Sequence, residues 1–119
     1  MENVMEGMEA LKEETTAEEE PKTFIERTES LLLIAPAGRL DTVMSNDLKE
    51  MLKGYDTTGV DVELDFAKVE YISSAGLRLL VSLQKQVKAG GHGMVIKNTN
   101  AVVNEVFRVS GFNKAFTVL

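Results

Sequence analysis

Two adjacent serines lie between a stretch in which apolar and polar residues alternate and a stretch with helical spacing of apolar residues, in "VELDFAKVEYISSAGLRLLVSL" (Val62 to Leu83). The hydroxyl groups of Ser73 and Ser74 allow three kinds of chemistry. Either can cap the following helix, because serine is among the favoured N-cap residues. Either can act as a nucleophile beside a general base, or can accept a phosphate group.

The nucleophile hypothesis requires a base that this sequence does not supply. A nucleophile elbow has glycine two residues before and two residues after its serine, and although Gly76 follows Ser74 at that spacing, Ile72 takes the preceding position. The one histidine, His92, lies in a "GGHG" turn, where we expect it to be exposed. Without an acid and base pair, we expect no catalytic residue and no enzymatic activity.

Phosphate and metal sites elsewhere in the chain are equally weak candidates. The stretch "AGGHGM" lacks the Lys-Ser/Thr of a phosphate loop and runs from helix to strand, the reverse of the required order. Asp65, with Asp41 and Asp61, could form a phosphoacceptor site of the receiver type, but a solvent-facing aspartate of an alternating strand explains Asp65 better. We therefore expect neither a metal nor a cofactor.

The residues around the serine pair favour a phosphate acceptor. Small residues at Ser73, Ser74, Ala75 and Gly76 leave the start of the helix sterically bare, so that another protein can approach the backbone closely. Unpaired N–H groups and the helix dipole stabilise negative charge at this end. A phosphate on Ser74 would add a charge of about −1.5 to −2 to such a surface without breaking the fold.

Composition excludes several classes of protein. The chain of 119 residues suits one domain with a real core, since 44% of its residues are hydrophobic. It has no cysteine, which excludes thiol chemistry and fits a reducing cytosol. The longest apolar runs, such as "LLLIAPA", are too short to span a bilayer, and the acidic N-terminus differs from a secretory signal. We expect a cytoplasmic protein without membrane insertion.

Charge is distributed very unevenly along the chain. Residues 1–20 contain eight Glu and one Lys, whereas the formal net charge of the whole chain is −6. The rest of the chain is nearly neutral and has no Lys/Arg stripe, so we expect no binding of nucleic acid. We predict that residues 1–21 form a disordered or loosely helical tail. Apolar residues at helical spacing leave a docking helix as the alternative for this tail: Val4, Met5, Met8 and Leu11.

Strand and helix patterns alternate after Pro21. "KTFIERTESLLLIAPAGRL" predicts two strands around a turn near residues 28–30, followed by a tight turn at Gly38 and a helix that ends near Gly54. "VDVELDF" predicts a strand, and a helix from Ser73 or Ser74 to about Ala89 follows. A strand "MVIK", a helix "NAVVNEVFRVSGF" and a strand "AFTVL" complete a mostly parallel sheet with helices packed on it. Periodicity predicts which residues of each helix face inward. In the first helix they are Val43, Met44, Leu48, Met51 and Leu52, and in the last helix they are Val102, Val103, Val106 and Phe107. In the middle helix Leu77, Leu80, Val81 and Val87 face inward, whereas Arg78, Lys85 and Lys88 point outward.

These features together strongly resemble STAS domains of the anti-sigma factor antagonist (anti-anti-sigma) type, from about Phe24 to Leu119. The resemblance rests on "GRLD" (residues 38–41), the strand-Ser-helix junction, the Gly-rich turn and "FRVSGF" (residues 107–112). It implies the α/β STAS fold over residues 22–119. That fold is a mixed, mostly parallel four- to five-stranded β-sheet with three to four α-helices packed on it.

Position by position, the resemblance also implies a modification site. Family members usually read Asp-Ser-Ser/Thr-Gly-Leu at the junction, and the first Ser accepts phosphate from a partner serine kinase of the histidine-kinase-like ATPase fold. Alignment on Gly76 and Leu77 puts the acceptor at Ser74, with Ser73 as a second candidate. This chain departs from the family because Ser73 replaces the Asp. The replacement removes like-charge repulsion toward a phosphate, and it also removes a hydrogen-bond acceptor for the hydroxyl of the acceptor serine. The implied partner-binding residues are Asp41, Ser73, Ser74, Ala75, Gly76 and Arg78.

The function implied by the resemblance is a switch rather than a catalyst. The unphosphorylated protein would bind an anti-sigma factor that is also a serine kinase, phosphorylation would release it, and a serine phosphatase would restore binding. A constitutive scaffolding or accessory module of a transporter or sensory complex is the alternative, in which Ser74 only caps the helix. The family's habit of binding nucleotides also leaves a weak ligand site near the junction as an alternative.

Overall fold

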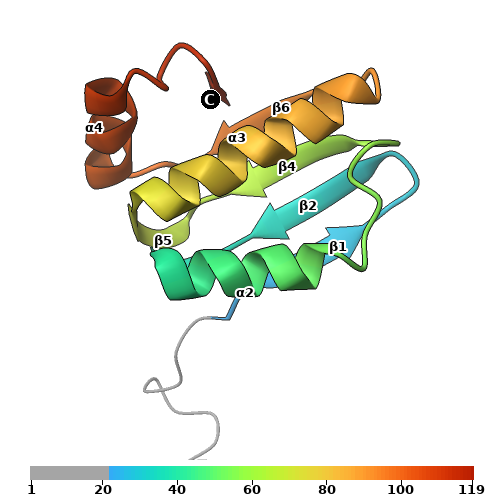
Figure 1. Ribbon diagram of the computed structural model, residues 1–119, viewed down its shortest axis with the longest axis horizontal. Helices are drawn as coiled ribbons and strands as arrows, with labels where there is room; N and C mark the ends of the chain where they lie inside the picture. The colour runs from blue at the N-terminus through green and yellow to red at the C-terminus, as the bar shows by residue number, and fades with distance from the viewer. Residues whose placement is uncertain (1–21) are drawn as a thin grey trace, which may run out of the picture.

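The computed structural model describes residues 22–119, so the predicted tail lies outside the described residues. Within this range seven strands and three helices alternate (Figure 1). The strands are β1 (Phe24–Arg27), β2 (Leu31–Ala35), β3 (Ala37–Leu40), β4 (Asp61–Asp65), β5 (Lys68–Ile72), β6 (Met94–Lys97) and β7 (Thr117–Val118). The helices are α2 (Thr42–Leu52), α3 (Ser74–Ala89) and α4 (Ala101–Ser110).

A five-stranded sheet in the order β1-β2-β4-β6-β7 forms the centre of the domain. Its β1 and β2 are antiparallel, and each further pair is parallel, so the prediction of a mixed, mostly parallel sheet is confirmed. The register puts Ile34 beside Leu64 and Leu64 beside Ile96. All three side chains are fully buried, which places the core at the middle of this sheet.

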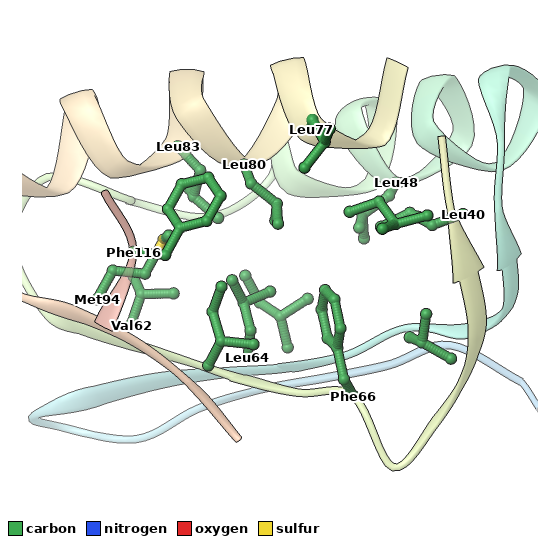
Figure 2. Packing of buried hydrophobic residues seen from close by; sticks show 14 of the residues in the cluster. Leu40, Leu48, Val62, Leu64, Phe66, Leu77, Leu80, Leu83, Met94 and Phe116 are labelled. Carbon is green, nitrogen blue, oxygen red and sulfur yellow. The ribbon is translucent and has the colours of Figure 1, made fainter. Parts of the chain in front are cut away.

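Helices α2 and α3 cover one face of the sheet, and α4 lies at its end (Figure 1). Leu77, Leu80 and Leu83 of α3 point from the helix into the core above Val62 and Leu64 of β4, as Figure 2 shows. Burial of Leu77 and Leu80 and exposure of Arg78 confirm the predicted orientation of this helix.

A second sheet, formed by β3 and β5 alone, is absent from the predicted order of elements. The sequence predicted a tight turn at Gly38, which is wrong, because Gly38 lies inside β3 with φ of +85° beside a shift in register. Pro36 separates β2 from β3 and has no N–H to donate to a ladder. The chain therefore leaves the main sheet there and pairs with β5, in parallel, instead.

Two predicted helix faces need correction. Val43 and Met51 of α2 are 70% and 43% exposed, and Val102 of α4 is 52% exposed. Each residue of a helix is rotated by about 100° from the one before, so a face that contains Leu48 and Leu52 turns Val43 toward solvent. The third buried residue of α2 is Ser45, which no hydrophobic pattern indicates.

Candidate functional site

Helices α2 and α3 begin side by side because the strands before them are paired. Leu40, the last residue of β3, lies opposite Ile72, the last residue of β5, in a parallel register. Asp41 caps α2, its carboxylate accepting a 3.0 Å hydrogen bond from the Met44 amide. Ser73 caps α3 in the same way, so the predicted residues at both helix starts are brought together by the small sheet.

Ser73 is tied to both neighbouring elements. Its backbone N–H and its hydroxyl each donate to the carbonyl oxygen of Leu40, at 3.0 Å in both cases. The hydroxyl oxygen also accepts a 3.3 Å hydrogen bond from the Gly76 amide. A carboxylate at this position could accept from Gly76 but could not donate to Leu40. The serine that departs from the family pattern thus joins β3 to α3.

Gly76 lies where α3 packs closely against the ends of β3 and β5. A Cβ atom on Gly76 would lie 2.7 Å from Cγ1 of Ile72 and 2.8 Å from the carbonyl oxygen of Leu40. Both distances are shorter than real Cβ contacts allow, so only glycine fits. Gly76 therefore faces the interior, and the lack of a side chain there serves the packing of α3 and does not open a surface to a partner.

Ser74 is the first residue of α3 and is exposed, in contrast to the half-buried Ser73. The first turn of α3 contains no acidic residue, so the partial positive charge of the helix N-terminus is not compensated there. Arg78 follows one turn later, and it too is exposed. Residues four apart on a helix are neighbours, so Arg78 can reach a negative group on Ser74.

A groove of about 620 Å³ runs between α2 and α3, and we call it the α2–α3 groove. Of the predicted partner-binding residues, Ala75 and Arg78 line it, whereas Asp41, Ser73 and Gly76 are bound into the helix starts at one end. Its other lining residues are Thr42, Ser45, Asn46, Lys49, Leu52, Lys53, Tyr55, Thr57, Leu79, Ser82, Leu83 and Gln86.

Ser45 is a residue of this groove that sequence reasoning missed. It is only 4% exposed, and its hydroxyl has no hydrogen-bond partner within residues 22–119. Buried hydroxyls are nearly always hydrogen-bonded, so one without a partner is notable. Its spacing to Leu48 and Leu52, three and seven residues, is the signal that could have placed Ser45 on the buried face.

We expect that Ser73→Ala lowers the free energy of unfolding by about 1 kcal/mol, the usual effect of losing an N-cap. Ser74→Ala is the matched control, and its effect should stay within about 0.5 kcal/mol because this side chain is exposed. Urea denaturation of the two variants measures both values. Equal losses from the two substitutions would contradict the assignment of Ser73 as the cap.

The other candidate residues form structural contacts. Asp65 accepts hydrogen bonds from the side chain of Asn98 and the amide of Ala67, and these lower the pKa of its carboxyl group. His92 is half-exposed rather than fully exposed, because its Nδ1 lies 3.2 Å from a carboxylate oxygen of Asp61.

Among residues 22–119, no cluster of His, Asp or Glu could hold a metal ion. No helix in that range is long and apolar enough to cross a membrane.

Comparison with protein families gives one domain model that matches residues 23–119, and its description is "STAS domain". A protein of Bordetella bronchiseptica, provisionally named the anti-sigma factor antagonist BtrV, is 30% identical over 98 residues. That alignment covers 82% of this chain and 84% of BtrV.

Solved structures with the same fold include two states of one regulator. The unphosphorylated anti-sigma factor antagonist SpoIIAA matches 82% of this chain and 87% of its own, with a TM-score of 0.69 and 18% identity. The phosphorylated form of SpoIIAA, described as a Bacillus cell fate determinant, covers 82% of this chain and 90% of its own, with a TM-score of 0.63 and 17% identity. At these identities the two structures establish the fold alone.

Proposed function

The chain belongs to the STAS domain family, of the anti-sigma factor antagonist type, and from this premise we propose that it is a partner-switching protein controlled by phosphorylation of Ser74. In its unphosphorylated state it binds an anti-sigma factor that is also a serine kinase. Phosphorylation ends that binding, and a serine phosphatase reverses it. The protein itself acts as a regulator in the cytoplasm and catalyses no reaction.

The difference between the two serines carries the proposal. Ser73 is half-buried, and its hydroxyl both donates to Leu40 and accepts from Gly76. A phosphate on Ser73 would remove the donated hydrogen bond and crowd the end of β3. Ser74 is exposed at the first position of α3, so its Oγ can receive the γ-phosphoryl group of ATP, releasing ADP and the hydroxyl proton, without disturbing the fold.

A phosphate at Ser74 suits its surroundings electrostatically. The uncompensated N-terminus of α3 and the guanidinium of Arg78 both favour negative charge there. The modified protein should therefore remain folded. The added charge lies at the exposed start of α3, and a charge placed in an interface at this position is unfavourable unless the partner pairs it.

Incubation of the purified protein with its kinase and ATP tests the proposal. Mass spectrometry should find phosphoserine in the peptide that spans Tyr71 to Arg78, at Ser74. Ser74→Ala should abolish the modification and Ser73→Ala should preserve it. Absence of phosphoserine from this peptide, or modification that persists in Ser74→Ala, would refute the switch.

A constitutive scaffolding module is the alternative that this experiment separates. Such a module would bind its partner equally well before and after incubation with kinase and ATP. Substitutions at Ser73 would then change binding only as far as they change stability, by the amount of a helix cap, about 1 kcal/mol.

A further inference from the structure

The charged side chains that line the α2–α3 groove are all cations. They are Lys49 of α2, Lys53 at the C-cap of α2, and Arg78 of α3. Lys53 pairs with Glu50 at 3.0 Å, but Lys49 and Arg78 make no ion pair within residues 22–119. The groove therefore presents two cations that nothing in the described part of the chain neutralises.

Between these cations, the groove has apolar walls. Leu79 is half-buried along one wall, and the buried Leu52 and Leu83 also line the groove. An occupant with apolar side chains and carboxylates would fit the apolar walls and the cations together.

The first twenty residues of the same chain have that chemistry. They carry eight Glu and one Lys, with Val4, Met5, Met8 and Leu11 at helical spacing among them. They join the described domain just before Thr23, whose hydroxyl accepts a 3.3 Å hydrogen bond from the Ala37 amide. Ala37 is the first residue of β3, and β3 leads directly into α2.

The length of this segment suffices to follow the groove. Twenty residues span about 30 Å as a helix and about 66 Å or more when extended. Helix α3, with its 16 residues, is about 24 Å long. In either conformation the segment is longer than α3, which forms one side of the groove.

We propose that residues 1–20 dock intramolecularly in the α2–α3 groove, with glutamates on Lys49 and Arg78 and apolar side chains along the leucines. Docking would cover Ala75 and Arg78. A further consequence rests on the proposed function: the docked segment would compete with the partner for the surface that contains Ala75 and Arg78.

Paramagnetic relaxation in the full chain tests the docking without a partner. Because the sequence has no cysteine, Ala10→Cys gives a single site for a nitroxide spin label. Amide signals of groove residues such as Ser45 and Ser82 should lose intensity, whereas those of β7 should keep it. The loss should disappear in 0.5 M NaCl, where the Debye length is only about 4 Å.

A pair of charge reversals supplies the matched control. Lys49→Glu should restore the intensities at the groove, and Lys88→Glu, an exposed lysine of α3 outside the groove, should not. Absent or uniform broadening, or equal effects of the two reversals, would overturn the proposal. Broadening that also appears when a spin-labelled chain is mixed with a separate ¹⁵N-labelled chain at equal strength would overturn it too, since the occupant would then be a second copy. None of these outcomes would bear on phosphorylation of Ser74, which is tested separately by mass spectrometry.

Discussion

Replacing Ser74 with aspartate is expected to weaken binding of the anti-sigma factor partner about thirtyfold to a hundredfold, equivalent to about 2–3 kcal/mol. Ser74 is exposed at the first position of α3, beside Ala75, whose small side chain offers little to screen a carboxylate from an approaching protein. Burial of an unpaired charge in the interface is the physical cause of the loss. Titration of the labelled partner with each variant measures the dissociation constants.

Ser74→Asn separates charge from shape in this experiment. Asparagine has the size of aspartate without its charge, so its binding should remain within about threefold of the original protein, less than 1 kcal/mol. Asp at the first position of a helix is favourable by about 0.3–1 kcal/mol, so the fold of Ser74→Asp should be at least as stable as before. Equal losses from Asn and Asp would show that shape, and not charge, decides binding.

Gly90→Ala is expected to destabilise the fold by about 3 kcal/mol or more, in the upper part of the range for overpacking. A Cβ atom on Gly90 would lie 1.6 Å from the carbonyl oxygen of Thr58 and 2.6 Å from its carbonyl carbon. These are backbone atoms of the loop between α2 and β4, so the loop itself has to move. The measurement is the midpoint of urea denaturation.

Two other glycines of the same turn provide the controls. Gly93→Ala meets no atom within 4 Å and should change stability by no more than about 0.5 kcal/mol. Gly91 also has open space but a φ of +82°, so alanine there should cost about 1 kcal/mol. If Gly90→Ala and Gly93→Ala unfolded at the same urea concentration, that result would contradict the close contact between Gly90 and the backbone of Thr58.

The close approach at Gly90 also matters for the α2–α3 groove. The Thr57 hydroxyl donates to the side-chain oxygen of Gln86, so the loop after α2 is joined to the last turns of α3. Thr57 and Gln86 both line the groove. The separation of the two helices at this end is thus fixed by a hydrogen bond and by a glycine that admits the loop.

Local patterns predicted most of the fold. Alternation of apolar residues predicted β4, and the serine pair with the following apolar face predicted α3 to within a residue. The failures have a common cause. β3 contains a glycine with positive φ and a shift in register, so its alternation is irregular, and β5 begins only three residues after the end of β4, so the two form one continuous alternating stretch of sequence. What stabilises both strands is their mutual pairing, across about thirty residues of chain.

The same limit applies to the candidate site. The sequence by itself determined that a bare, capped helix start follows a strand, because cap and periodicity signals depend on neighbours within a few residues. It placed Ser73 and Ser74 there but left their roles open. Only the tertiary structure assigned the cap to Ser73 and left Ser74 exposed, because the hydrogen bond that occupies Ser73 goes to Leu40, 33 residues earlier. Likewise Ser45 and Lys49 line the same groove as Arg78 only because β3 and β5 pair, so that α2 and α3 start side by side. No local sequence pattern encodes this contact between the two helices, because it depends on the pairing of strands that are distant in the chain.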